Sequence, residues 1–446
     1  MMSKILRLSL IVSMLVIIKS KENEIVDWEK YIDENKPNEL KTSDKRFISL
    51  NGIDKIKHLT VIALPRCKIV NIDSLKNLTL LFDLDLSNNQ IVRIDSLQNL
   101  ILLSDLDLSN NEIFRIDSLK NLILLKNLIL FNNQIIDIDA LINLKYLEYL
   151  DLSNNKIFNI DVLKNLISLK SLYLSNNQID SIQFIQNLTN LIDLSLSNNR
   201  KINLNYLINL KSLSRLYLSN VNIADIDVLE YLKLLKTLDL SNNQISKIDS
   251  LQQLELLTEL DLSNNKIKNI DALQNLISLR ELYLSNNQIE NISCLKNLQS
   301  LWRLHLSNNK IIDIDFISSF LYFNDLRIFN NKISNNSSGF KLFTKDQVFL
   351  TSPNISSTID LINRFTEIYI FQPKINYFEK IYNYKKFNKN YLQSVNILIM
   401  DDFYFVNCSQ TIEFMKRNLH LNLLYYIQVD NFFSKCEFLD FDSLIT

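Results

Sequence analysis

Four carboxylates of this 446-residue chain recur with a spacing that could do chemistry. They stand in two identical Asp-Leu-Asp triplets placed 22 residues apart, and they are Asp83, Asp85, Asp105 and Asp107. Neighbouring carboxyl groups can act as general acid and general base in hydrolysis, provided that a pocket excluding water gives them unlike pKa values. Whether these four meet that condition depends on the elements that carry them.

Other side chains with reactive or ligating groups are sparse. The chain has two glycines, whereas a loop that cradles phosphate needs several. Its three histidines, at positions 58, 305 and 420, show none of the spacings of zinc sites or metalloprotease helices. We therefore expect no catalytic residues, no cofactor and no metal. With 48 basic and 49 acidic side chains, the charge balance does not favour nucleic acid as a partner.

A 22-residue period organises the chain. Leucines recur at this interval without interruption, at Leu84, Leu106, Leu128, Leu150, Leu172, Leu194, Leu216, Leu238, Leu260, Leu282, Leu304 and Leu326. We number the positions of each repeat from Leu81, so that the first clear unit, residues 81–102, reads LFDLDLSNNQIVRIDSLQNLIL. The alternation at positions 4 to 6 predicts a short strand, and the later apolar spacing of three predicts a helical or 3₁₀ turn.

These units predict an α/β solenoid. Each unit can bury its leucines only against its neighbours, so the strands are expected to stack into one parallel sheet. The sheet would line a concave face, and the short helical turns would line the convex face. An open sheet supplies no pocket that excludes water, which argues against catalysis by the four carboxylates.

Two polar columns are interpreted as structural. Position 9 is asparagine in most repeats from Asn89 to Asn331, and its amide is expected to satisfy the backbone of adjacent turns. Cys67 takes this place in a degenerate first repeat. Position 15 is often aspartate, as at Asp73 and Asp139, and we expect this residue to be the N-cap of the helical turn. Lys201 and Val221 depart from the pattern, which suggests a local kink near residues 199 to 223.

Positions 2, 3 and 5 are expected to face solvent on the concave side, since strand side chains alternate. Acidic residues outnumber basic ones in these columns, and Asp193 is among the acidic members. The like charges at positions 83, 85, 105 and 107 favour a cationic contact. The alternative is that aspartate is merely a soluble choice for an exposed strand.

Large aromatic side chains occupy the same columns. They include Tyr149, Tyr173, Tyr217, Tyr283 and Trp302. Exposed aromatics on a rigid sheet are frequent interface anchors, although tyrosine also suits strands in general. The predicted partner-binding residues are therefore Asp83, Asp85, Asp105, Asp107, Tyr149, Tyr173, Tyr217, Tyr283 and Trp302.

Both ends of the chain differ from the repeats. Residues 1–20 combine Lys4 and Arg7 with an apolar run to Ile18, which predicts a secretory signal, the alternative being an apolar flank of a cytosolic protein. An apolar run of this length is too short to span a membrane. Residues 21–46 are expected to form an N-terminal flank or cap, and residues 47–336 a solenoid of about 13 repeats. Residues 337–446 hold 22 Phe and Tyr and predict a C-terminal cap with a small α+β region.

The repeat unit L-x-x-L-x-L-S-N-N-x-I-x-x-I-D-x-L-x-N-L resembles the 22-residue class of leucine-rich repeat. This class includes bacterial internalins and the SDS-type regulatory subunit of type-1 protein phosphatase. The resemblance covers about residues 47 to 336 and implies the solenoid fold, while its functional meaning is broad. The phosphatase regulator resembled here binds its enzyme through acidic and aromatic concave residues, and this chain offers the same residue types.

The sequence predicts a non-catalytic scaffold that binds a partner protein on its concave face, secreted or at the cell surface. Two alternatives stay open. One is an intracellular regulatory subunit, cytoplasmic or nuclear, of an enzyme such as a type-1 phosphatase. The other is a structural repeat protein without a dedicated partner.

Overall fold

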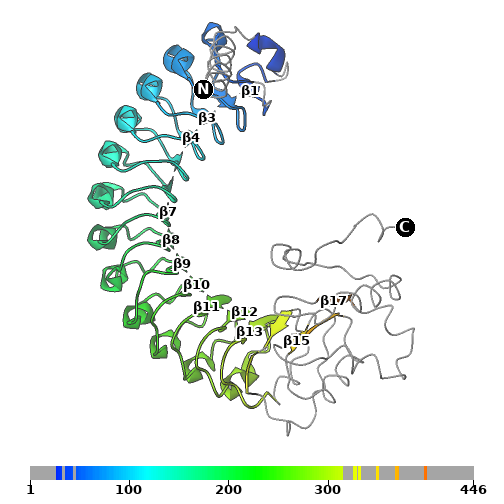
Figure 1. Ribbon diagram of the computed structural model, residues 1–446. Coiled ribbons are helices and arrows are strands. Elements are labelled where there is room, and N and C mark those ends of the chain that lie inside the picture. The colour runs from blue at the N-terminus through cyan, green and yellow to red at the C-terminus, as the bar shows by residue number, and fades with distance from the viewer. Residues whose placement is uncertain are drawn as a thin grey trace, which may run out of the picture. The chain divides into compact units, whose positions relative to one another are not determined.

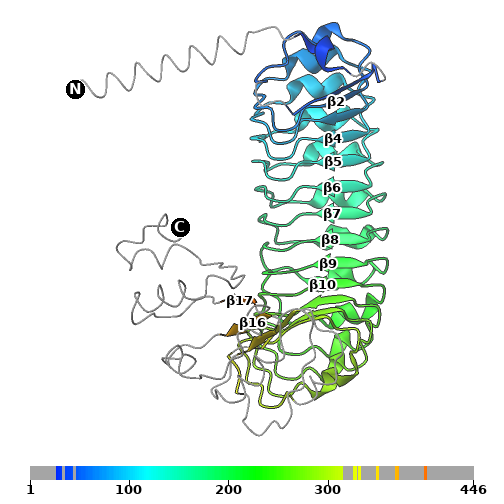
Figure 2. The ribbon, with the colours of Figure 1, turned by 90° about the vertical axis from the view of Figure 1, so that its right-hand side faces the viewer.

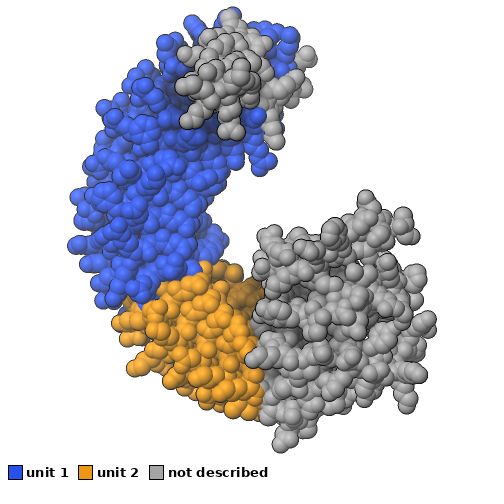
Figure 3. Space-filling view, in the orientation of Figure 1, with its two compact units in different colours: residues 1–223, 231–235 blue, residues 224–230, 236–446 orange. Residues whose placement is uncertain are grey.

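The computed structural model describes residues 27–32, 36–43, 47–314, 325–328 and 330–332, together with the backbone of three later strands. Short strands alternate with 3₁₀ helices, and they fall into two compact units, residues 1–223 with 231–235 and residues 224–230 with 236–446 (Figure 3). The predicted solenoid of parallel strands and 3₁₀ turns is confirmed.

Unit 1 carries nine of the described strands. They are β1 (Glu39–Lys41), β2 (Val61–Ala63), β3 (Asp83–Asp85), β4 (Asp105–Asp107), β5 (Asn127–Ile129), β6 (Tyr149–Asp151), β7 (Ser171–Tyr173), β8 (Asp193–Ser195) and β9 (Arg215–Tyr217). Each strand pairs in parallel with the next along the chain, so that equal repeat positions lie side by side. Figure 2 shows these strands stacked one above another, and Figure 1 shows them along the inner side of the curve of unit 1.

Unit 2 continues the same arrangement. Its strands are β10 (Thr237–Asp239), β11 (Glu259–Asp261), β12 (Glu281–Tyr283), β13 (Arg303–His305), β14 (Asp325–Arg327), β15 (Val348–Leu350), β16 (Glu367–Ile370) and β17 (Asn396–Leu398), again paired in parallel in chain order. Strands β15, β16 and β17 belong to residues 337–446, for which the sequence predicts a C-terminal cap with a small α+β region. The rest of that region lies outside the described residues.

The returns between strands are 3₁₀ helices. They are η1 (Trp28–Tyr31), η2 (Ile53–Lys55), η3 (Asp73–Asn77), η4 (Asp95–Asn99), η5 (Asp117–Asn121), η6 (Asp139–Asn143), η7 (Asp161–Asn165), η8 (Gln183–Asn187), η9 (Leu204–Leu207), η10 (Asp227–Tyr231), η11 (Asp249–Leu251), η12 (Asp271–Leu273) and η13 (Ser293–Asn297). In Figure 1 the helical turns of unit 1 lie opposite its strands. The three-residue spacing of leucine and isoleucine fits the three residues per turn of this helix, so one row of side chains faces the core.

The core is a stack of leucine and isoleucine. Leu84, Leu128 and Leu172 are fully buried, and the other repeats bury the same positions. Before the first clear repeat, Trp28 packs its ring 4.7 Å from that of Phe47 and donates a hydrogen bond from Nε1 to the carbonyl of Asn51, at 3.1 Å. The segment preceding residue 47 thus adds a strand, β1, and a buried tryptophan to the repeat stack.

The predicted asparagine ladder is confirmed. Asn89 Nδ2 donates to the carbonyls of Leu64 and Leu86, and Asn89 Oδ1 accepts from the backbone N–H of Ile69 at 2.8 Å. The same pattern recurs at Asn111, Asn133, Asn155, Asn265, Asn287 and Asn309. One side chain therefore satisfies backbone groups of two adjacent repeats, which the core would otherwise leave unpaired.

The asparagine at position 8 has a different role, which the sequence analysis did not identify. Asn88, Asn110 and Asn132 have φ angles of 56°, 54° and 55°, in the left-handed region. Asparagine tolerates this region better than most residues other than glycine. It therefore turns the chain out of the strand in a protein that has only two glycines.

The prediction that the position-15 aspartates are N-caps is wrong. The N-cap of η3 is Ile72, and that of η6 is Ile138, without a side-chain capping bond in either case. Because the 3₁₀ helix starts at position 15, the capping acceptor comes from position 13 instead. Asp137 Oδ1 accepts from the backbone N–H of Asp139 at 2.8 Å, and Asn159, Asp225, Asn269 and Asn291 act in the same way.

The backbone changes where the sequence departs from the pattern. Ile202 is buried in place of the exposed Lys201, and η9 starts one position earlier than the neighbouring helices. Asn220 and Asn222, on either side of the buried Val221, both have a φ of 54°. The boundary between the two compact units follows directly, after Ile223.

Candidate protein-binding face

The strand face consists of the side chains at positions 3 and 5 of each strand. They flank the buried leucine at position 4, so that most strands show a buried residue between two half-buried ones. Parallel register aligns these side chains into two rows. In unit 1, the position-3 row runs from Asp83 to Arg215 and the position-5 row from Asp85 to Tyr217.

The four predicted carboxylates lie together at one end of these rows. Asp83 pairs with Asp105 across β3 and β4, and Asp85 pairs with Asp107. Burial raises the pKa of Asp83, and the negative charge of Asp105 raises it further, against the opposing charge of Lys41. The predicted juxtaposition of like charges is confirmed.

Part of this carboxylate cluster also serves the fold. Asp85 Oδ1 accepts from the backbone N–H of Ser87 at 2.8 Å, and Asp107 does the same with Ser109. Equivalent bonds join Asp151, Asp239 and Asp261 to the serine two residues later. Aspartate at position 5 therefore holds the chain where it leaves the strand, a role beyond solubility.

The predicted tyrosines of unit 1 gather on β6 to β9. The rings of Tyr149 and Tyr173 lie 5.5 Å apart with an interplanar angle of 43°, and Tyr217 stands in the same row as Tyr173, two strands further on. Burial raises the pKa of Tyr149 to about 12, and the carboxylate of Asp151 adds to the effect. Both the rings and the local field of negative charge are thus suited to a cationic or aromatic contact.

Strand β8 differs from the other strands of known side-chain burial, because all three of its residues are buried. Asp193 is only 4% exposed, so the expectation that it faces solvent is wrong. Its Oδ2 accepts from Arg215 Nη2 at 2.6 Å and from Ser171 Oγ at 2.9 Å. These two neighbours in the position-3 row close over the carboxylate.

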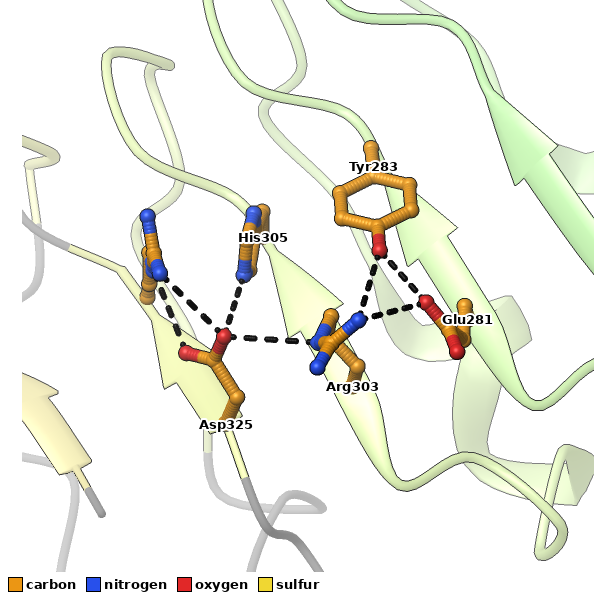
Figure 4. Close-up of polar contacts among 6 residues, drawn as sticks. Glu281, Tyr283, Arg303, His305 and Asp325 are labelled. Atoms are coloured by element: carbon orange, nitrogen blue, oxygen red, sulfur yellow. Dashed lines mark hydrogen bonds and ion pairs between the residues drawn. The ribbon is translucent and has the colours of Figure 1, made fainter. Parts of the chain in front are cut away.

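The remaining predicted residues, Tyr283 and Trp302, belong to unit 2. The hydroxyl of Tyr283 donates to Glu281 Oε2 at 2.5 Å and accepts from Arg303 Nη1 at 3.1 Å (Figure 4). Burial and the bond to Glu281 raise the pKa of Tyr283 to about 12. The guanidinium of Arg303 lies 5.1 Å from the ring centroid of Trp302. Tyr283 and Trp302 therefore both contact Arg303.

Sequence reasoning did not identify His305 as part of this face. Its Nε2 lies 3.0 Å from Asp325 Oδ2, and its ring lies edge-on to Tyr283 at 4.8 Å (Figure 4). Burial alone would raise the pKa of Asp325. The bond to His305 and the charge of Arg327 outweigh burial and hold this pKa below its usual range. The available signal was positional, because His305 occupies position 5, the column of Tyr283.

Two further observations concern ligands and membranes. Among the described residues, no group of three His, Cys, Asp or Glu is placed to hold a metal ion. Within the same residues, no helix combines the length and the apolar character needed to cross a bilayer.

Comparisons with known proteins agree with this architecture. The family model described as leucine-rich repeats in two copies matches residues 211–253, 255–297 and 277–319, and a single-repeat model matches residues 146–166 and 168–188. A search among curated proteins found no match.

Several solved structures are similar. An internalin, InlF, from Listeria monocytogenes is 32% identical with a TM-score of 0.63, covering 65% of this chain and 86% of its own. A leucine-rich-repeat protein of Leptospira interrogans is 21% identical with a TM-score of 0.64, covering 85% and 97%. The plant peptide hormone receptor RGFR1, in complex with RGF2, is 21% identical with a TM-score of 0.58, covering 72% and 61%. The last two likenesses concern the fold alone.

Proposed function

The chain belongs to the leucine-rich-repeat family and resembles the internalins, and from this premise we propose that it is a scaffold that binds a partner protein on the strand face of unit 1. Leucine-rich repeats commonly mediate protein–protein interaction, including the binding of ligands by receptors. Proteins of this kind are typically not enzymes. The proposal names the face and the residues of this chain that would carry the interaction.

The observation that carries the proposal is the aromatic pair Tyr149 and Tyr173 next to the carboxylate of Asp151 on β6, in the same sheet as the carboxylates of β3 and β4. Tyrosine contributes a large area and a polar tip, and it loses little conformational entropy on binding. The asparagine ladder, and the bonds from serine N–H groups to the position-5 aspartates, hold the strands that carry these tyrosines rigid. A rigid surface with half-buried rings is the arrangement expected of interface anchors.

The experiment is affinity capture from the native host with the full chain as bait. The double variant Tyr149→Ala, Tyr173→Ala should lose a partner that the wild type retains, because it removes both rings. Phe158→Ala is the matched control, since Phe158 is an exposed aromatic, 56% accessible, outside the strand face. A partner retained by the double variant, or lost equally from the control, would refute the proposal.

Export is a separate part of the proposal. Secretion or surface display agrees with the signal expected at residues 1–20 and with the likeness to an internalin. The N-terminal sequence of the protein isolated from its host provides the test. A chain beginning near residue 21 would support export, and a chain retaining Met1 with cytosolic fractionation would oppose it. Regulation of a type-1 phosphatase stays a prediction from resemblance alone.

A further inference from the structure

Asp193 is a buried charged residue with one unsatisfied oxygen. It is the one charged residue that is buried among the described residues, and its Oδ1 accepts no hydrogen bond from any of them. Its other oxygen, Oδ2, is bound by Arg215 and Ser171. A buried carboxylate normally has its acceptor sites filled, because an unpaired charge is costly at low dielectric. One half of this carboxylate therefore lacks the partner that its burial demands.

Arg215 binds Asp193 through only one of its N–H groups. Arginine and carboxylate favour a fork in which two N–H groups reach two oxygens, whereas here one nitrogen, Nη2, reaches one oxygen. The side chain of Arg215 is 50% exposed, so its charge is largely available to water. Arg215 can therefore leave towards solvent when another cation takes its place on the buried Asp193.

The surroundings suit a planar cation. In the position-5 row, the small Ser195 lies between Tyr173 and Tyr217, and Tyr149 stands beside Tyr173. Guanidinium groups stack on such rings, while an ammonium group offers no plane to stack. Apart from Arg215, strands β6 to β9 carry two charged residues at positions 3 and 5. These residues are Asp151 and Asp193, and both are acidic.

We propose that Asp193 on β8 receives an arginine side chain of the partner protein, and that Arg215 occupies this place until the partner binds. The inference rests on the proposed function and specifies the chemistry of the partner. The incoming guanidinium pairs with both oxygens of Asp193 and stacks against the neighbouring tyrosines, while Arg215 moves into solvent.

The equivalent arginine of unit 2, Arg303, is held by more groups than Arg215. Arg303 binds Glu281 Oε2 at 2.7 Å and the hydroxyl of Tyr283 at 3.1 Å, and it also pairs with Asp325 at 3.4 Å. Three groups thus hold Arg303, whereas Asp193 alone holds Arg215 among the hydrogen bonds and ion pairs of the described residues. Removal of Arg303 would free the carboxylates of Glu281 and Asp325 beside Tyr283, so this variant is not a negative control.

Methylguanidinium serves as the probe, with methylammonium as its non-planar counterpart. The full chain carries 3-fluorotyrosine, and ¹⁹F spectra follow the titration, with the ring signals assigned by single Tyr→Phe variants. Arg215→Ala should bind methylguanidinium on the order of tenfold more tightly than the wild type, and methylammonium more weakly. Adding Asp193→Asn should abolish this gain. Arg93→Ala should show none, because the carboxylate that Arg93 binds, Asp95, is already exposed.

Several results would overturn the inference: no gain in Arg215→Ala, an equal gain for methylammonium, or a gain that survives Asp193→Asn. Should Arg215→Ala fail to fold, Arg215→Gln keeps a short donor to Asp193 and opens the same space. The titration needs no natural partner. A negative titration, together with a partner that the wild type captures and the Tyr149→Ala, Tyr173→Ala variant loses, would reject only the arginine site. A partner that the double variant retains would reject the proposed function.

Discussion

Burial and neighbouring negative charges disfavour the ionised form of individual carboxylates on the strand face. Asp83 lies beside Asp105 on the adjacent strand. Burial makes the larger contribution to raising the pKa of Asp83, and the charge of Asp105 makes the next largest. The folded state therefore disfavours the ionised form of this residue relative to the unfolded chain. The cost exists wherever Asp83 is charged in both states, and it disappears once the residue is protonated in both.

Replacing Asp83 by asparagine should stabilise the protein at neutral pH. Because the folded pKa lies above the ordinary value of 3.8, the free energy of unfolding of Asp83→Asn should exceed that of the wild type by about 0.2–1 kcal/mol at pH 7, the range of cross-strand charge pairs. The gain should fade as pH falls through the raised pKa, and it should be absent at pH 3. Urea denaturation at the two pH values measures it.

Asp54→Asn is the matched control, since Asp54 is exposed and lies on η2, outside the strand face. A gain at pH 7 that persisted at pH 3 would show that the effect is not electrostatic. No gain at pH 7 would show that solvent screens the pair fully.

At the scale of the element, the start of several 3₁₀ helices depends on an Asp or Asn side chain at position 13. Asp137→Ala removes the acceptor of the Asp139 N–H and should lower the free energy of unfolding by about 1 kcal/mol, as loss of a capping side chain does. Asp139→Ala, two residues later, should change it by less than half as much. Urea unfolding of the two variants compares their stabilities directly. Equal losses would indicate that the side chain at position 15 contributes as much to capping as the one at position 13.

Much of the elements and their register could be predicted from the leucine period. A strict interval of 22 residues places Leu84 beside Leu106, and position 3 of one strand beside position 3 of the next. The cap could not be located in this way, because the pattern does not distinguish a helix that starts at position 15 from one that starts at position 16. That choice depends on the backbone angles of Ile72 and its equivalents.

The content of the candidate site was predictable only in part. Residue type and column indicated Tyr149 and Tyr173, which do lie together. The burial of Asp193 depends on how the long side chain of Arg215, 22 residues later, folds back across the row. The contact between His305 and Asp325 likewise joins two repeats through the conformations of both side chains. A repeat pattern contains no information about these conformations.

At the scale of the whole molecule, each repeat contacts mainly its neighbours, so repeats should be separable units of stability. Deletion of residues 257–278, one complete period in unit 2, joins Leu256 to Leu279 and keeps every later position in phase. The shortened chain should fold, with circular dichroism per residue unchanged and cooperative thermal unfolding retained.

Deletion of residues 257–267, half a period, is the control. It brings positions 12 to 22 directly after Leu256, so η12 follows without the strand that should precede it. This variant should lose cooperative unfolding. If both deletions were tolerated equally, neighbour-to-neighbour packing of whole repeats would not be what stabilises unit 2.

The separation of buried and outward-facing residues within most three-residue strands has an evolutionary consequence. In most strands one leucine enters the core, and the two residues beside it face outward. Mutations that change the outward pair leave the buried leucine and the ladder asparagine untouched. A lineage carrying this gene can therefore acquire new binding preferences through a few codon changes. The position-5 aspartates that bond the following serine are the outward residues on which selection for folding also acts.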